Sequence, residues 1–420
     1  MAFPASGAPA TDAAAGPRRA TALAAAVVTA ATAAWGGAGC PRRGHDTPHP
    51  DAALDAGVDD APAPAVHPPG WRNVAPLGKA PLELAGALIP HGADALIAGE
   101  PGETVVYALK RDYALSALFH VEFSSPASPT LGPPLVLRGP SSEATRVGRY
   151  LAFAVAEAGR PPELLLVRGG APPRVIGRAR LDAPMLGPIA VAGDVVYVAT
   201  AAAIEGLPEP PDPHLLAFRA TPGEGAGAAA EVEGALEPLG SVPLPAPARA
   251  LAVVGRRLVV ATGAPDPVLV LPLDDAGRPA PRGSTLGYRV VQKLAFREYA
   301  FAAAPRALCA AGPDLALASD PHTTFVALRL DPTPHLSFAP PFTHSKGGGL
   351  LAVETVPGGA ARLYRLRGQR LFVDALDAAG RPTPLARLRL GLGGSGRALA
   401  LVPGLVLAAD DAFGLYLFPR

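Results

Sequence analysis

The chain has 420 residues, of which 49% are hydrophobic and 17% are charged. This composition excludes a wholly disordered polymer and provides enough apolar residues for a large core, although the sequence contains 51 prolines and 47 glycines. The formal net charge is +1 at pH 7. Because the basic and acidic residues nearly cancel, there is no electrostatic reason to expect a nucleic-acid partner.

The N-terminus has the pattern of a signal peptide. Arg18 and Arg19 precede an uncharged stretch that ends at Trp35, and small residues lead from there to Cys40. The uncharged stretch is too short and too rich in alanine to span a bilayer stably. We therefore expect residues 1–39 to be removed during export, and the remaining chain then has 35 basic and 35 acidic residues.

Cys40 ends a run, Gly37-Ala38-Gly39-Cys40, that resembles a bacterial lipobox. The run departs from that motif at Gly37, where leucine is usual, and ordinary cleavage after small residues is the alternative. The resemblance implies a lipoprotein held by lipid on Cys40, in the periplasm, at the outer membrane or on the cell surface. Cys309, the other cysteine, then has no intramolecular partner and is expected to pack in the core.

Residues 40–72 are rich in proline, aspartate and alanine. This composition predicts an extended, disordered linker between the lipid and a folded body. The folded body is expected to begin at residue 73.

A short apolar hairpin recurs in the rest of the chain. Two apolar strands flank a glycine-containing turn in residues 187–200, 249–262, 306–318 and 397–408. Third strands are predicted at residues 105–110, 164–168, 215–219, 268–274, 325–331, 371–377 and 414–418. A recurrence of roughly 50 residues with four short strands is typical of a β-propeller blade. Residues 73–420 are therefore predicted to form an all-β, seven-bladed propeller.

The last blade lacks a fourth strand, because the sequence ends just after its third. Residues 73–84 are expected to supply that strand and close the ring, which leaves no long sheet edge open. The irregular strand spacing in residues 350–376 also allows six or eight blades. A pair of β-sandwiches is the alternative architecture.

One strand carries a family resemblance. Val196-Tyr197-Val198-Ala199-Thr200 resembles the strand signature of YVTN and lactonase-like propellers, whose repeat period is similar to that of residues 73–420. The resemblance implies the same ring. It also implies an enzymatic alternative, a propeller hydrolase that holds a divalent cation at the axial mouth.

Acidic residues gather in the predicted connections between second and third strands, which share one face of a propeller with the connections between blades. We expect this face to attract a basic partner, Ca²⁺ or another divalent cation; ordinary solvated turns are the alternative. An aromatic cluster after the fourth blade predicts either an interface anchor or a packed insertion. The candidate binding residues are Glu100, Glu205, Asp320, His322, Asp410, Asp411, Tyr288, Phe296 and Tyr299.

No catalytic motif accompanies these residues. Residues 391–396 match G-x-G-x-x-G, but an apolar strand follows them where a dinucleotide site needs a helix. We expect no catalytic residues and no cofactor beyond a divalent cation. The sequence therefore favours a monomeric binding or assembly platform for a protein or another envelope component, with contact to the membrane through the lipid alone.

Overall fold

The computed structural model describes most of the chain after residue 68, and the described residues all belong to one compact unit, residues 66–420. They are residues 69–82, 93–100, 102–111, 114–157, 159–181, 186–200, 212–221, 234–263, 267–287, 289–294, 297–302, 305, 307–319, 325–339, 350–355, 361–410 and 413–420. Every regular element among them is a β-strand. A search of these residues finds no helix long and apolar enough to cross a membrane. The predicted signal peptide and Cys40 lie outside the described residues.

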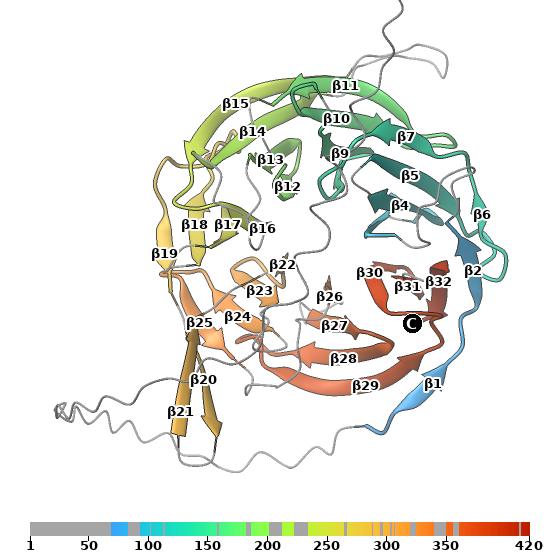
Figure 1. Ribbon diagram of the computed structural model, residues 1–420. Helices are drawn as coiled ribbons and strands as arrows, with labels where there is room; N and C mark the ends of the chain where they lie inside the picture. The colour runs from blue at the N-terminus through green and yellow to red at the C-terminus, as the bar shows by residue number, and fades with distance from the viewer. Residues whose placement is uncertain are drawn as a thin grey trace, which may run out of the picture. The chain divides into compact units, whose positions relative to one another are not determined.

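Seven sheets of four or five strands stand side by side in a ring, so the chain is a seven-bladed β-propeller, as predicted (Figure 1). The strands of a blade are lettered A to D from the ring axis outward. Blades 1 and 2 contain β3 (Ala95–Ala98), β4 (Val105–Arg111), β5 (Leu115–Glu122) with β6 (Thr130–Leu131) and β7 (Leu135–Arg138), then β8 (Thr145–Val147), β9 (Tyr150–Val155), β10 (Glu163–Arg168) and β11 (Arg174–Arg180). Blades 3 and 4 contain β12 (Ile189–Ala192), β13 (Val195–Ala199), β14 (His214–Thr221) and β15 (Ala235–Pro243), then β16 (Ala248–Val254), β17 (Arg257–Thr262), β18 (Val268–Pro272) and β19 (Ser284–Leu286).

The remaining blades follow the same order. Blades 5 and 6 contain β22 (Ala307–Ala310), β23 (Leu315–Ser319), β24 (Val326–Arg329) and β25 (His335–Phe338), then β26 (Leu350–Thr355), β27 (Ala361–Arg367), β28 (Arg370–Leu376) and β29 (Pro382–Leu390). Blade 7 contains β30 (Gly396–Val402), β31 (Leu405–Asp410), β32 (Gly414–Pro419) and, as its outermost strand, β2 (Gly78–Pro81). A separate hairpin, β20 (Arg289–Leu294) and β21 (Arg297–Ala302), is inserted between blades 4 and 5.

The N-terminal segment closes the ring. β2 pairs antiparallel with β32, with Lys79 opposite Tyr416, and this confirms the predicted closure. A further strand, β1 (Arg72–Val74), was not expected: it pairs parallel with β29 and makes blade 6 five-stranded. The N-terminal segment therefore runs along the rim of two blades (Figure 1).

One predicted strand was assigned to the wrong position in its blade. Residues 105–110 were expected to form the third strand of blade 1, but they belong to β4, which is the second strand; β5 is the third. The error arose because residues 99–104 separate β3 from β4, whereas blades 2, 3, 4 and 7 have a two-residue turn at this place. One such turn is Gly193-Asp194, where Gly193 has a φ of 58°.

Seven apolar clusters form the core of the described chain, one at each interface between neighbouring blades. The middle strands are buried on both faces because a blade covers each side; every residue of β9 and of β31 is buried. The outermost strands are more exposed, because no further strand covers them: β15 buries only Leu236 and Val242. Cys309 packs partly buried against the cluster between blades 5 and 6, and burial raises the pKa of its thiol to about 12.

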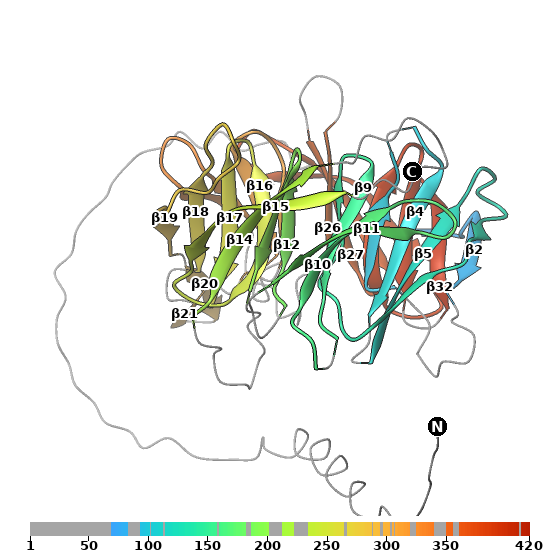
Figure 2. The ribbon, with the colours of Figure 1, turned by 90° about the horizontal axis from the view of Figure 1, so that it is seen from above.

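The strands run up and down along the ring axis, so successive connections alternate between the two faces of the ring (Figure 2). The A–B and C–D connections lie on one face, called here the A–B face. The B–C connections and the D–A connections between blades lie on the other, called the D–A face. Residues 391–395 connect β29 to β30 on the D–A face, which agrees with their interpretation as a turn between blades.

Candidate functional site

The structure separates two of the acidic candidates. Glu100 lies between β3 and β4 and therefore on the A–B face, whereas Asp410 ends β31 on the D–A face. The expectation that both share one acidic face is wrong, because it depended on the misplaced strand in blade 1. Tyr299 lies on β21 opposite Gln292. The other candidates lie outside the described residues: Glu205, Asp320, His322, Asp411, Tyr288 and Phe296.

Asp410 is fully buried and hydrogen-bonded to the backbone. Its Oδ1 accepts the amides of Phe413 at 2.8 Å and Gly414 at 3.2 Å, and its Oδ2 accepts the amide of Gly394 at 2.7 Å. Burial alone would raise the pKa of Asp410, but these hydrogen bonds outweigh it and hold the pKa below its usual value. The carboxylate thus links the turn after β31 to the connection between blades 6 and 7, while its role in binding a partner stays a prediction.

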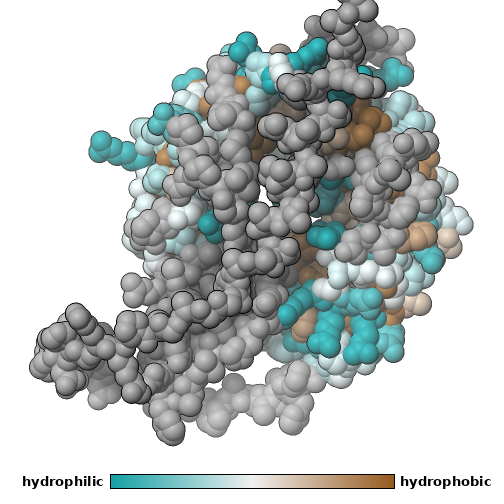
Figure 3. Space-filling model, in the orientation of Figure 1, coloured by the Kyte–Doolittle hydropathy of each residue, from teal (hydrophilic) through white to brown (hydrophobic). Residues whose placement is uncertain are grey.

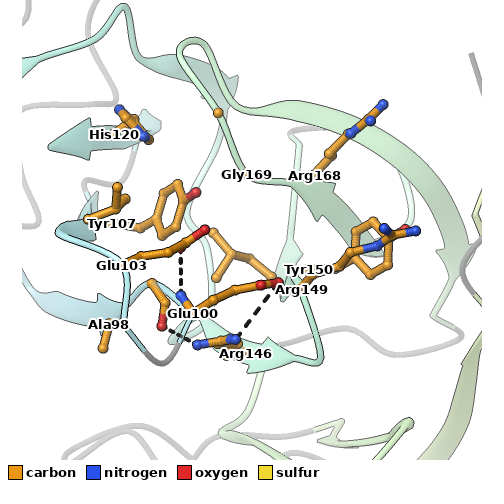
Figure 4. Close-up of a pocket in the computed structure, with 14 residues that line it drawn as sticks. Ala98, Glu100, Glu103, Tyr107, His120, Arg146, Arg149, Tyr150, Arg168 and Gly169 are labelled. Atoms are coloured by element: carbon orange, nitrogen blue, oxygen red, sulfur yellow. Dashed lines mark hydrogen bonds and ion pairs between the residues drawn. The ribbon is translucent and has the colours of Figure 1, made fainter. Parts of the chain in front are cut away.

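A polar groove with a volume of about 280 Å³ opens between blades 1 and 2 on the A–B face. Residues from both blades line it, as Figure 4 shows. Its polar side chains are those of Glu100, Glu103, Tyr107, His120, Arg146, Arg149, Tyr150 and Arg168. Glu100 is the one sequence-predicted candidate among them.

Backbone groups hold the acidic side of the groove in place. Glu103 Oε2 accepts the backbone amide of Glu100 at 2.7 Å. Arg146 donates from Nε to the carbonyl of Gly148 at 2.6 Å and from Nη1 to the carbonyl of Gly99, and its Nη2 lies 4.0 Å from Glu100 Oε1. These contacts join Arg146 of blade 2 to the connection between β3 and β4 in blade 1 (Figure 4). They leave few rotamers open to the side chains of Glu103 and Arg146.

The basic side of the groove carries two arginines without a counter-ion. Arg149 Nε donates to the hydroxyl of Tyr150 at 2.9 Å, and its guanidinium lies 5.3 Å from the centroid of that ring. Arg168 lies directly opposite Tyr150 across β9 and β10. Neither guanidinium forms an ion pair within the described part of the chain. An anionic group could therefore bind here.

Tyr107 and His120 form the neutral wall of the groove. Their rings meet edge to face, with centroids 5.6 Å apart. Burial, and then the charge of Glu103, raises the pKa of Tyr107, and burial lowers the pKa of His120 against the opposing effect of Glu122. Both side chains are uncharged at neutral pH, and each can donate or accept a hydrogen bond.

A second groove shows which features are particular to the first. It has a volume of about 310 Å³ and occupies the equivalent place between blades 3 and 4. Its two arginines are paired, since Arg219 Nε lies 3.3 Å from Asp194 Oδ2 and Arg256 Nη2 lies 2.5 Å from Asp275 Oδ1. Of these two grooves in the described part of the chain, the one between blades 1 and 2 offers guanidinium groups without an ion pair, and we take it as the candidate site.

Sequence reasoning missed most of this groove, because its side chains are spread over residues 100–168 and meet only when two blades pack together. No local pattern joins Glu103 to His120 or Arg168. A search of the described residues finds no group of three or more His, Cys, Asp or Glu side chains that could hold a metal ion. The divalent cation stays a prediction, since most acids expected to bind it lie outside those residues.

Several solved structures have a similar fold. The periplasmic gluconolactonase PpgL of Pseudomonas aeruginosa is 15% identical over 76% of this chain and 90% of its own, with a TM-score of 0.48. The WD40 β-propeller domain of Doa1 is 8% identical over 80% of this chain and 95% of its own (TM-score 0.48), and Sqt1 of Saccharomyces cerevisiae is 10% identical over 80% and 83% (TM-score 0.49). At these identities the likeness concerns the fold alone. No protein-family model and no curated protein sequence matches the chain.

Proposed function

We propose that the chain is an exported, lipid-anchored β-propeller that serves as a binding platform, and that the groove between blades 1 and 2 is one of its binding sites. The supporting observation is that charged groups from two blades are already held in position there, Arg146 by backbone carbonyls and Glu103 by a backbone amide. Groups fixed before a ligand arrives lose little entropy on binding, which favours recognition of a polar ligand.

The charges of the groove suggest what it binds. Arg149 and Arg168 present guanidinium groups that suit a carboxylate or phosphate, and Glu103 lies across the groove from them, where it suits a cationic or hydrogen-bond-donating group. A ligand or side chain with both features would fit. A protein or another envelope component carries both an anionic group and a cationic or hydrogen-bond-donating group, so either could be the ligand of a binding platform.

The binding site is tested by affinity capture from envelope extracts with the mature chain after cross-linking. The wild type and an Arg256→Gln control, altered in the second groove, should retain the same partner. A variant with both Arg149→Gln and Arg168→Gln should retain at least about ten-fold less, because each loses a charge-assisted contact. Equal recovery by that variant would exclude this groove, and a parallel capture with chelator shows whether a divalent cation takes part.

The lipid anchor has a separate test. The wild-type chain should incorporate a labelled fatty acid and sediment with membranes, because the Cys40 thiol accepts the lipid. Cys40→Ser should remove both properties and leave the fold unchanged. Labelling of the Cys40→Ser chain, or sedimentation without any label, would contradict lipidation at Cys40.

A hydrolase is the second candidate, and one observation favours it. His120 has a lowered pKa and is neutral at neutral pH, which is the protonation state a general base requires. Hydrolysis of lactone or ester substrates by the wild type, lost in His120→Ala and retained in Arg256→Gln, would support the enzyme over the platform.

A further inference from the structure

Blade 6 carries a row of three arginines across its strands. Arg367 of β27 lies opposite Arg370 of β28, and Arg370 lies opposite Arg389 of β29. Residues directly opposite in a sheet project from the same face about 5 Å apart. All three side chains are exposed, and none forms an ion pair within the described part of the chain.

A second row next to it adds further positive charge. Arg365, Phe372 and Arg387 are cross-strand neighbours two residues along and share the same face. The two guanidiniums share one buried carboxylate: Arg365 Nη2 lies 2.7 Å from Asp374 Oδ2, and Arg387 Nη1 lies 2.9 Å from Asp374 Oδ1. This row keeps one uncompensated positive charge.

Trp71 lies beside the arginine row and directly precedes β1 in the N-terminal segment that carries β1 and β2. Its ring meets Phe372 edge to face at 5.3 Å, and the guanidinium of Arg370 lies 5.3 Å from its centroid. Trp71 is nevertheless 42% exposed. Figure 3 shows hydrophilic side chains gathered at the lower right, where Figure 1 places β27 to β29. An exposed tryptophan beside arginines is the composition of an interface anchor.

This arrangement does not serve folding. Like charges directly opposite in a sheet are destabilising. Elsewhere in the ring, two strand arginines lie against carboxylates, since Arg178 lies 2.6 Å from Glu163 and Arg257 lies 2.6 Å from Asp331. Blade 2 has a single like-charged pair, in which Arg168 lies opposite Arg174. The arginine row of blade 6 is longer, because it places like charges at three consecutive cross-strand positions, and an anionic partner would relieve their repulsion.

We infer that the arginine row and Trp71 form a docking surface for an acidic polypeptide segment. Three guanidiniums in line suit carboxylates on one face of an extended chain, because flexible arginine side chains can reach groups about 6.6 Å apart and bind each through paired N–H groups. The surface faces blade 5, since the guanidinium of Arg365 lies 5.4 Å from the ring centroid of Phe325. A surface that faces a neighbouring blade is reached more readily by a narrow peptide than by a planar lipid surface. The inference does not depend on the groove between blades 1 and 2.

The probe is a short fluorescent peptide of alternating glutamate and alanine, titrated into the full mature chain and followed by anisotropy. Binding should weaken as salt is added. A variant with Arg367→Gln, Arg370→Gln and Arg389→Gln should bind at least about ten-fold more weakly, and Trp71→Ala should also bind more weakly. A control with Arg138→Gln, Arg174→Gln and Arg282→Gln removes the same charge from exposed positions on other blades and should bind as the wild type does.

The thermal midpoint distinguishes a binding role from a structural one. Relief of the like-charge contacts should leave the melting temperature of the blade 6 triple variant equal to that of the wild type or higher, while its affinity falls. Equal binding of the glutamate peptide by the two triple variants overturns the inference, and so does equal binding of a lysine–alanine peptide. Binding of phosphatidylglycerol vesicles through the arginine row, without binding of the acidic peptide, also overturns it and assigns the surface to a membrane.

Discussion

At the scale of single residues, the same side-chain type has different roles in different surroundings. Asp410 is the last residue of one short strand and Glu100 follows another, yet Asp410 is fully buried among amides and Glu100 is exposed in a groove. A buried carboxylate is stable only where hydrogen bonds replace its lost hydration. Asp410 has three such bonds to backbone amides, and its place in the fold follows from them.

Asp410→Asn is expected to destabilise the ring by about 2 kcal/mol at pH 7, because an amide nitrogen would face backbone donors. The folded-state pKa of Asp410 lies below its ordinary value of 3.8. Its stabilisation is therefore present above about pH 4 and is lost as the pH falls through the folded-state pKa. Urea unfolding of both chains across this range measures the difference, with exposed Asp275→Asn as the control. A gap that stays constant in acid would contradict the assignment.

At the scale of elements, a turn that occurs twice in the sequence joins strands C and D of its own blade and is hydrogen-bonded to the preceding blade. The sequences 274–278 and 377–381 form the same C–D turn: Asp274 Oδ1 accepts the amides of Ala276 and Arg278, and Asp377 Oδ1 accepts the equivalent pair. Each turn accepts a hydrogen bond from an arginine of the preceding blade, Arg219 or Arg329. The sequence match thus marks a contact between blades as well as a turn.

Gly380→Ala should show how closely this turn packs. Gly380 has a φ of 78°, and an added Cβ would lie 2.4 Å from Cβ of Ala327 in blade 5. Gly404 is the matched control, since its φ is 74° but nothing lies within 4 Å of an added Cβ. Gly404→Ala should cost about 1 kcal/mol from the backbone alone, and Gly380→Ala about 1–3 kcal/mol more from the clash. Equal losses of unfolding free energy would show that the turn can move away from blade 5.

At the scale of the whole molecule, stability comes from a closed circle of interfaces. Each blade buries its faces against two neighbours, and the cluster between blades 7 and 1 includes Ala80 and Leu82 of the N-terminal segment, both fully buried. β2 also covers the edge of β32. The segment that closes the ring therefore contributes to packing and to sheet pairing at once.

A chain that begins at residue 83 should lose this closure. Its β32 edge and the apolar cluster between blades 7 and 1 would be open to water, so we expect a lower melting temperature and concentration-dependent aggregation. A chain that begins at residue 69 keeps β1 and β2 and should melt as the full chain does. A peptide of residues 69–84 added in trans should restore the shorter chain. Identical melting of the two truncated chains would show that closure is dispensable.

The sequence determined the architecture because propeller blades are local. Apolar hairpins such as residues 249–262 carry their own strands and turns, so their recurrence predicts a ring and requires a closing strand. In blade 1 the same reasoning failed, since a longer connection replaced the tight turn. Only the tertiary structure decided which arginines have an ion pair: Arg178, Arg219 and Arg257 have carboxylate partners on other strands, turns or blades, whereas Arg149, Arg168 and the arginine row have none in the described part of the chain. Local sequence does not encode those distances, because they arise when the blades pack together.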